Sequence, residues 1–364
     1  MRTTLIGAIL LTLAAGFAPA TATATAAATA ASTAAATDTA SAPAGRSVPR
    51  TVLDVRDLEQ GAPPAIAWSE RRSGTTVIHG LDGSTTPVPN AVTELTPMGS
   101  GYVIQTAGNR PTTRWVAADG TPGRREWRTG YGLAVSAKGG AVAFSGRGGT
   151  VWSIDDEGDR VLRFNPVPIT GKGRAAALVG ESCKEGDEGN GCSIYVNGND
   201  GSWFTSSHGI VDTTPRLRTV TTGRDRWLGG ITSTSDVGSC SAMLRSWKVR
   251  WRTCDNQLGG ISTDNRRVIG TPAYADGFGP TALDILSTRT GAVEARFTAN
   301  RRSATYFDEV WEDDSHVLVV TFQRGRGGTG EWAVVRLGLD GSMEYAVAPR
   351  AGTDAQFPFQ LQTR

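Results

Sequence analysis

The segment "GGISTDNRRVIG" (Gly259 to Gly270) has the pattern of a strand, a tight turn and a second strand. Ile261 and Ser262 end the first run, Asp264-Asn265 form the turn, and Val268-Ile269 begin the next run. Short β-branched runs bounded by Asp, Asn and Gly are typical of a β-hairpin. Similar segments occur elsewhere in the 364-residue chain, so this hairpin is one copy of a repeat.

Seven turns of this kind, aligned on the apolar residue that opens the following strand, start 36, 40, 34, 51, 41 and 50 residues apart. The segments are QGAPPAIAW (from Gln60), TPMGSGYVI (Thr96), SAKGGAVAF (Ser136), TGKGRAAAL (Thr170), TTGRDRWLG (Thr221), STDNRRVIG (Ser262) and EDDSHVLVV (Glu312). A second turn follows further along most units, at Leu81, Ala118, Asp156, Asn199, Arg289 and Leu339. Several of these turns contain Asp-Gly, which suits the left-handed positions of a hairpin.

Each unit therefore contains four short strands, and helix signals are poor outside the first 45 residues. Four antiparallel strands repeated every 34 to 51 residues predict an all-β fold, a seven-bladed β-propeller of four-stranded antiparallel blades. A single blade cannot bury both faces, but blades packed around an axis bury each other. Ring closure is left open: "TVLDVRDL" (Thr51 to Leu58) offers a first inner strand, and "FPFQLQ" (Phe357 to Gln362) either pairs nearby or forms a loose tail.

The turn "STDNRRVIG" resembles the Ser-Pro-Asp-Gly-(Arg/Lys) turn of TolB-type, WD-repeat-like propeller units of bacteria. "TTGRDRWLG" and "EDDSHVLVV" are degenerate versions of the same turn. The resemblance extends over the seven turns between residues 60 and 320. It implies a propeller with a polar central channel, and it provides no catalytic residues to transfer.

The amino-terminal region has the features of an export signal. Arg2 precedes an apolar run from Leu5 to Gly16, and Ala18-Pro19-Ala20 offers a cleavage site. We expect a signal peptide at 1–20, a disordered Ala/Thr-rich linker at 21–45 and the propeller domain at 46–364. No later stretch approaches the roughly 20 apolar residues of a membrane span, so we expect a secreted, extracellular protein.

Net charge and cysteine content narrow the class of protein further. The formal net charge of +2 gives no field that would gather nucleic acid. Four cysteines in an exported chain favour disulfides. Of the three possible pairings we expect the local one, Cys183–Cys192 and Cys240–Cys254, with the second bond joining the strands of an outer hairpin. No Cys-x-x-Cys occurs and only three His residues are present, which disfavours zinc.

Two acidic segments carry candidate ligands. The loop "ESCKEGDEGNGC" contains Glu185, Asp187, Glu188 and Asn190, oxygen ligands that suit Ca²⁺. Their spacing does not match an EF-hand, and a solvated loop is the alternative.

The second acidic segment, "FDEVWEDDSH", supplies the channel candidates Asp308, Glu312, Asp314 and His316. If Tyr306 to Glu312 form an innermost strand, Asp308 and Glu312 would face one side near the central channel. A cation or a basic ligand would bind there. An ordinary solvated strand end is the alternative.

Two further motifs lack the structural surroundings that their usual functions require. Ser207 and His208 are adjacent in an expected strand and would point to opposite faces, which disfavours a nucleophile–base pair. "GRGGTG" (Gly325 to Gly330) is followed by an expected strand, whereas a dinucleotide site needs a helix amino terminus.

The sequence therefore favours a non-catalytic binding module, a monomer that recognises a protein, peptide or glycan through one face or the channel. The alternative is a channel-mouth hydrolase or lyase that uses carboxylates and a bound metal. A third hypothesis is a structural envelope component held by its tether. The only cofactor considered is Ca²⁺.

Overall fold

The structure is a computed structural model. It describes Val48 and residues 50–108, 111–155, 161–183, 191–275, 279–300 and 304–364, all in the compact unit Ser47–Arg364. These residues form strands β1 to β28 and one short 3-10 turn, η1 (Arg326–Gly328). The all-β prediction is confirmed.

Five of the sheets each contain a blade of four antiparallel strands, and in four of them the blade is the whole sheet. From the inner to the outer strand, one blade contains β28 (Phe359–Leu361), β2 (Trp68–Arg72), β3 (Thr75–His79) and β4 (Thr85–Val88), and a second contains β12 (Arg174–Val179), β13 (Ser193–Gly198), β14 (Gly201–Ser206) and β15 (Val211–Thr213). The third blade contains β16 (Thr219–Arg224), β17 (Trp227–Ser235), β18 (Gly238–Arg245) and β19 (Lys248–Thr253). The fourth contains β24 (Ala304–Trp311), β25 (His316–Arg324), β26 (Thr329–Gly338) and β27 (Met343–Thr353). In these blades each strand is paired with the next strand along the chain, except β28, which comes from the far end of the chain.

The fifth blade belongs to a five-stranded sheet. Its four antiparallel strands are β20 (Asn256–Ile261), β21 (Arg267–Pro272), β22 (Ala282–Ser287) and β23 (Val293–Ala299). The additional strand, β1 (Arg50–Leu53), pairs in parallel with β23 at the outer edge.

The sixth sheet has seven strands, in the order β11-β10-β9-β8-β7-β6-β5. Their bounds are β5 (Val92–Met98), β6 (Gly101–Thr106), β7 (Thr112–Ala117), β8 (Pro122–Val135), β9 (Ala141–Gly146), β10 (Val151–Asp155) and β11 (Val161–Phe164). Strand β8 is 14 residues long. Its first part pairs with β7 and its last part with β9, with a register shift between Thr129 and Leu133. The predicted count of seven blades is therefore not directly evident from the sheets.

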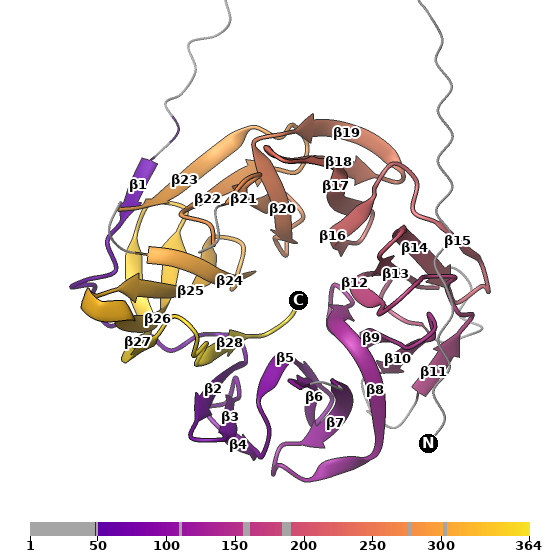
Figure 1. Cartoon of the computed structure of the whole chain (residues 1–364), viewed down its shortest axis with the longest axis horizontal. Coiled ribbons are helices and arrows are strands. Elements are labelled where there is room, and N and C mark those ends of the chain that lie inside the picture. The colour runs from indigo at the N-terminus through magenta and orange to yellow at the C-terminus, as the bar shows by residue number, and fades with distance from the viewer. Residues whose placement is uncertain are drawn as a thin grey trace, which may run out of the picture. The chain divides into compact units, whose positions relative to one another are not determined.

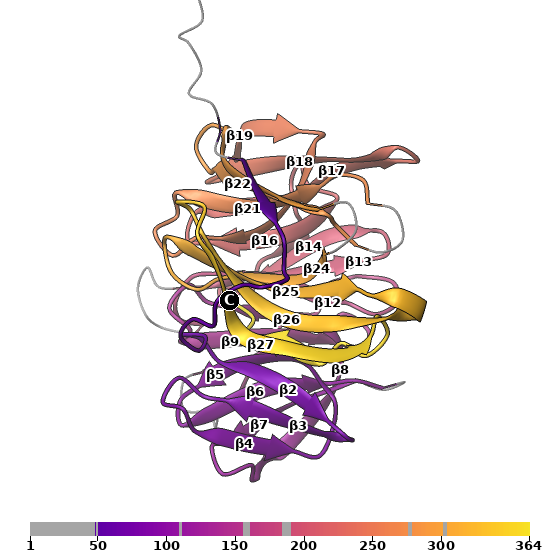
Figure 2. The ribbon, with the colours of Figure 1, turned by 90° about the vertical axis from the view of Figure 1, so that its left-hand side faces the viewer.

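The sheets are arranged around a common axis as a β-propeller, with one strand of each blade facing the centre (Figure 1). The inner strands contact one another in the order β28, β5, β8, β12, β16, β20 and β24, and β24 contacts β28 again. Figure 2 shows the same arrangement from the side, with β1 running along the outer surface.

Hydrophobic packing lies between neighbouring sheets rather than in one central core. One cluster combines Leu283, Ile285 and Phe297 of the β20–β23 blade with Val319 and Val335 of the β24–β27 blade. Similar clusters lie between other neighbouring sheets. Because each blade covers its neighbour, both faces of a thin sheet are removed from water.

The two ends of the described chain take different roles in closing the ring. The segment Thr51 to Leu58, one candidate for the first inner strand, does not take that place, because β1 instead lies at the outer edge of β23. The segment near Phe357 to Gln362 is not a loose tail: β28 pairs with β2 and completes its blade. Beyond it, Gln362 N donates to Ala67 O at 3.0 Å and Thr363 N donates to Leu95 O at 2.8 Å.

One predicted turn is misplaced within its blade. The repeat predicts that the segment starting at Thr170 connects a first and a second strand, but this segment leads into β12, which is itself the inner strand. The connection from β12 to β13 is instead the segment that contains Cys183 and Cys192. The turn at Asn199 consequently joins the second and third strands, while the turn at Asp156 lies outside the described residues.

Candidate functional site: the central channel

Irregular pairing recurs on the inner strands. Six of them shift register against the second strand, so one to three residues have no pairing partner there. The skipped residues are Thr93 on β5, Gly130 to Gly132 on β8, Ala176 on β12, Thr221 on β16, Gly259 and Gly260 on β20, and Phe307 on β24. A bulge bends its strand and redirects side chains, and bulges often occur beside functional sites.

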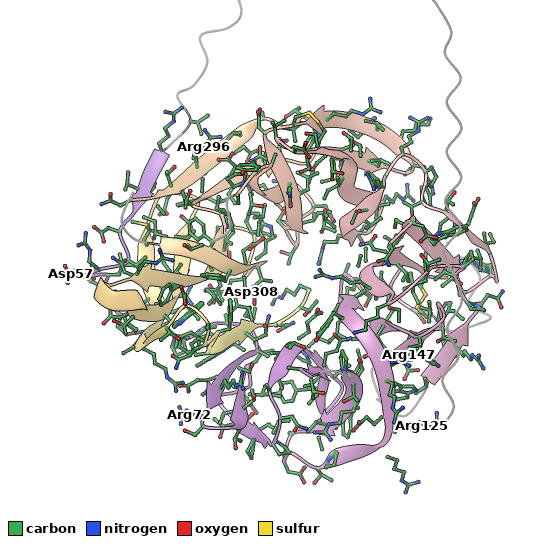
Figure 3. The ribbon with its side chains drawn as sticks, in the orientation of Figure 1. Asp57, Arg72, Arg125, Arg147, Arg296 and Asp308 are labelled. Carbon is green, nitrogen blue, oxygen red and sulfur yellow. A yellow bond between two sulfur atoms is a disulfide. The ribbon has the colours of Figure 1, made fainter. Side chains whose placement is uncertain are left out.

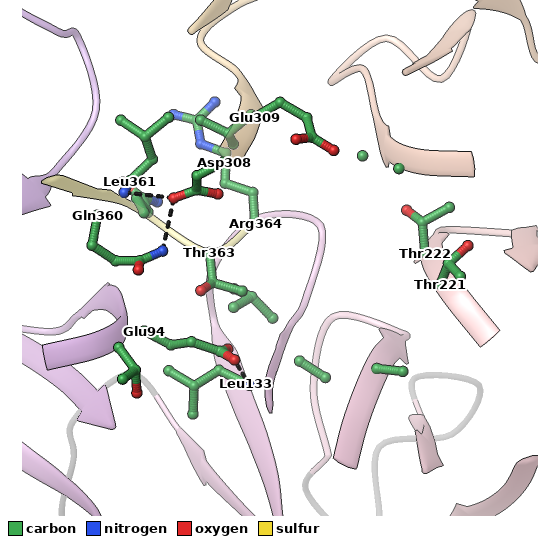
Figure 4. A pocket seen from close by; sticks show the side chains of 18 of the residues that line it. Glu94, Leu133, Thr221, Thr222, Asp308, Glu309, Gln360, Leu361, Thr363 and Arg364 are labelled. Atoms are coloured by element: carbon green, nitrogen blue, oxygen red, sulfur yellow. Dashed lines mark hydrogen bonds between the residues drawn. The ribbon is translucent and has the colours of Figure 1, made fainter. Parts of the chain in front are cut away.

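These bulges surround a cavity of about 730 Å³ at the centre of the ring. All the skipped residues except those of β8 line it, and β8 contributes Leu133 to Val135. The carboxy-terminal segment from Phe359 to Arg364 also lines it. Figure 4 shows part of this wall, with Thr221 and Thr222 across the space from Glu309. A cavity of this size suits a small ligand or one end of a larger one.

Asp308, a predicted channel residue, is one of the cavity-lining residues. Figure 3 places it beside the central opening, whereas Asp57, Arg72 and Arg125 lie at the outer rim. Its Oδ2 accepts hydrogen bonds from Leu361 N at 2.9 Å and from Gln360 Nε2 at 2.7 Å. Burial raises the pKa of Asp308 to about 7 despite these hydrogen bonds.

Glu94 takes the position on β5 that Asp308 takes on β24. Glu94 and Asp308 each directly follow the bulge of their strand, and Glu94 Oε2 accepts a hydrogen bond from Leu133 N of β8 at 2.6 Å. Burial also raises the pKa of Glu94. Both carboxyl groups thus bind a backbone N–H of the next inner strand, which gives them a structural role between neighbouring blades.

Glu309 differs from these two residues. Among the described residues no hydrogen bond to its carboxyl group is found, and its side chain extends toward the cavity and β20 (Figure 4). A Cβ atom added to Gly259 would lie 3.3 Å from its Oε1. Burial, and secondly the charge of Asp308, raise the pKa of Glu309 to about 8.

Four arginines also line the cavity: Arg71, Arg174, Arg224 and Arg364. Arg224 donates from Nη2 to Ala137 O at 2.7 Å, while its buried Nε has no partner among the described residues. Arg364 donates to Trp311 O at 3.1 Å and to Glu312 O at 3.0 Å. Burial lowers the pKa of the Arg364 guanidinium. The wall therefore offers both acidic and basic groups.

The other three predicted channel residues are not brought together with Asp308. Glu312 forms an ion pair with Arg336 and accepts a hydrogen bond from Ala65 N at 2.6 Å. The remaining two lie at turns: Asp314 accepts hydrogen bonds from Thr263 Oγ1 and Asp264 N, and His316 pairs with Asp313 at 2.9 Å. None of the three is a cavity-lining residue. The hydrolase or lyase alternative, which used these carboxylates, stays a prediction.

The predicted Ca²⁺ ligands Glu185, Asp187, Glu188 and Asn190 lie outside the described residues, so that site stays a prediction. Within the described part of the chain, no group of three or more His, Cys, Asp or Glu side chains is arranged to hold a metal. Of the described histidines none lines the cavity. His79 instead stacks on Trp68, with ring centroids 3.9 Å apart.

Both expected disulfides are present, Cys183–Cys192 and Cys240–Cys254. Cys240 lies on β18 and Cys254 directly follows β19, where Ser241 pairs with Thr253. The second bond therefore joins the two outer strands of its blade, as predicted.

Glu94 and Glu309 were not among the predicted channel residues. Glu309 is adjacent to Asp308 in the quoted acidic segment, which was the available signal. Glu94 is a single acid in "VTELTPM", and only the structural alignment of bulges relates it to Asp308.

Comparisons with known proteins add two structural likenesses. No protein-family model and no curated protein matches the chain. Among solved structures, BamB from Moraxella catarrhalis is similar at 12% identity and a TM-score of 0.44, over 79% of this chain and 84% of that chain. The β-propeller domain of Cps50 (Swd1) from Myceliophteria thermophila is similar at 10% identity and a TM-score of 0.45, over 78% of this chain and 88% of that chain.

The propeller assignment rests on the sheets and the ring of this structure itself. Within the described residues no helix has the length and apolar character needed to cross a bilayer.

Proposed function

We propose that the protein is an extracytoplasmic seven-bladed propeller that acts as a binding module through its central channel. The observation that carries this proposal is the cavity of about 730 Å³, whose wall combines bulged inner strands with carboxyl, hydroxyl and guanidinium groups. Such a wall offers hydrogen-bond donors and acceptors in a recess partly removed from water. The partner is a protein, peptide or glycan, bound by a monomer.

The count of seven blades is supported by β8. Its first part is the outer strand of β5–β8, and its last part is the inner strand of β8–β11. Counting the two sets separately gives seven inner strands, which match the contact order around the ring. The TolB-type resemblance of the turns agrees with repeated units of this kind.

An extracytoplasmic location is supported by two disulfides, which persist in oxidising compartments. The expected signal peptide at 1–20 and the linker at 21–45 belong to the same proposal. Sequencing the amino terminus of the protein recovered from culture medium tests it, and recovery only inside the cell with residues 1–20 intact would contradict it.

The binding proposal is tested with a variant that narrows the channel. Thr221 lines the cavity at a bulge, so Thr221→Tyr adds a ring to the space without changing charge. Thr85→Tyr on the exposed outer strand β4 is the matched control. The immobilised wild-type protein and the control are expected to capture the same partner from extracytoplasmic fractions, identified by mass spectrometry, while Thr221→Tyr loses it. Equal capture by all three proteins would place binding outside the channel and contradict the proposal.

A further inference from the structure

Glu309 differs in chemistry from the residues at the same place on two other inner strands. It is the second residue after the bulge of β24, where it pairs with Val319. At this place β5 has Leu95 and β12 has Leu178, and each of these residues is at most 1% exposed. A position that these two strands fill with a buried leucine carries a half-buried carboxyl group here. Burying such a group costs free energy unless a partner compensates it.

The surroundings of Glu309 leave room for that partner. Gly259 and Gly260 on the neighbouring strand β20 carry no side chains and line the cavity, and Gly259 lies directly beside the Glu309 carboxyl group. Thr221 and Thr222 lie across the space (Figure 4). We call the space bounded by Glu309, the two glycines and these two threonines the diglycine niche.

The charged groups facing the cavity do not neutralise Glu309. They are Asp308 of β24, Glu94 of β5, Arg71 of β2, Arg174 of β12, Arg224 of β16 and Arg364 of the carboxy-terminal segment. Of these, Asp308 acts on Glu309 and disfavours its charged form. None of the four arginines forms an ion pair with Glu309 among the described residues. Within the described part of the chain Glu309 thus has no cationic partner, and a ligand can supply one.

We propose that Glu309 anchors a cationic primary amine of the ligand in the diglycine niche, with the amine flanked by the hydroxyl groups of Thr221 and Thr222. This inference rests on the proposed binding function and names the chemistry that the channel recognises. An ammonium group has three donors, which a carboxylate and hydroxyl oxygens accept. A lysine side chain, a peptide amino terminus or an amino sugar carries this group.

The inference implies that a proton leaves the protein on binding. The neutral carboxylic acid gives up its proton to solvent, and the resulting carboxylate pairs with the ammonium group, which keeps all its protons. The pKa of Glu309 is about 8 in the free protein, so only the ionised fraction binds below that pH. Apparent affinity is reduced by that fraction. Affinity therefore rises with pH up to about 8 and then levels off.

Isothermal titration calorimetry with the full chain tests this, with cadaverine as the amine probe and 1,5-pentanediol as the uncharged probe of equal length. Wild-type protein is expected to bind cadaverine more tightly near pH 9 than near pH 6, to release a proton in buffers of different ionisation enthalpy, and not to bind the diol. Glu309→Gln is expected to weaken cadaverine binding at least roughly tenfold. Glu331→Gln, which removes an exposed carboxylate on β26, is the matched control and leaves binding unchanged.

Glu309→Leu installs the residue that β5 carries at this place, so it provides a second variant if the glutamine variant folds poorly. Unchanged cadaverine binding by a folded Glu309 variant, equal binding of the diol, affinity that falls as pH rises, or no binding of cadaverine would each overturn the inference. If Thr221→Tyr nevertheless loses the native partner, the channel still binds it and only the amine assignment fails.

Discussion

At the scale of single residues, Glu309 links the site to stability. Its carboxyl group has a pKa of about 8 in the folded chain against a usual 4.5. Between these pH values the folded state holds a proton that the unfolded state has released, so stability falls as pH rises through this window. Glu309→Gln removes the effect. It is expected to be more stable than wild type by roughly 1–3 kcal/mol near pH 9, and by much less near pH 5.

Urea titrations of wild type, Glu309→Gln and Glu331→Gln at both pH values measure this difference. A gain for Glu309→Gln that is the same at both pH values would show that packing, rather than ionisation, causes it. The exposed control is expected to follow wild type throughout.

A second prediction at this scale concerns Gly132, at the bulge of β8. Its φ is +108°, and a Cβ atom there would lie 2.3 Å from Ala175 O of β12. Gly132→Ala therefore combines backbone strain with a clash between neighbouring inner strands, and we expect a loss of at least roughly 3 kcal/mol. Gly139 has φ +78° and no atom lies near its Cβ direction. Gly139→Ala therefore introduces backbone strain without a clash, and we expect it to lower the free energy of unfolding by about 1–2 kcal/mol. Equal losses for the two variants in thermal melts would contradict the predicted clash.

At the scale of elements, the outer strand β19 carries an unfavourable charge pair. Lys248 pairs directly with Arg245 across β18 and β19, and both are exposed. Like charges directly opposite each other destabilise a sheet. Lys248→Glu is expected to stabilise the chain by about 0.5–1 kcal/mol at low salt, and Lys248→Gln by about half as much, because it only removes the repulsion. Denaturant midpoints in low and high salt check this, and a gain that survives high salt would argue against an electrostatic origin.

Most strands and turns could be predicted because their signals are local. Asp-Gly and Asp-Asn turns between short apolar runs appear in the structure where the sequence placed them, as at Asp264. The turn starting at Thr170 was assigned to the wrong place in its blade because a Gly-rich connection before an inner strand resembles one after it. The pairing of β1 with β23 joins residues far apart in sequence, and no local pattern encodes it.

The site was less predictable than the fold for a related reason. Alternation along the strand predicted that Asp308 and Glu312 face one side, and the pairing of β24 is regular from Asp308 to Trp311, but only Asp308 of the two lines the cavity. Alternation does not show that Glu312 is paired with Arg336, or that the Glu309 carboxyl group has no hydrogen bond among the described residues. The sequence does not show where a bulge falls, because a bulge depends on the pairing of two strands.

At the scale of the whole molecule, stability depends on how the ring closes. Strand β28 completes the blade of β2 to β4, so residues from both ends of the described chain share one sheet. Leu361 on β28 is 1% exposed and belongs to the cluster that joins this blade to the β24–β27 blade. Because each blade covers its neighbour, loosening the closing strand exposes two interfaces at once.

We therefore expect Leu361→Ala to cost about 2–5 kcal/mol and to lower the unfolding temperature of the whole propeller in a single transition. Leu81→Ala removes the same atoms from a side chain that is 63% exposed, and it is expected to change stability by less than about 0.5 kcal/mol. Differential scanning calorimetry measures both. If Leu361→Ala produced a separate early transition while the main one kept its wild-type temperature, the closing blade would unfold independently, and the ring would not be the cooperative unit that its interlocked blades imply.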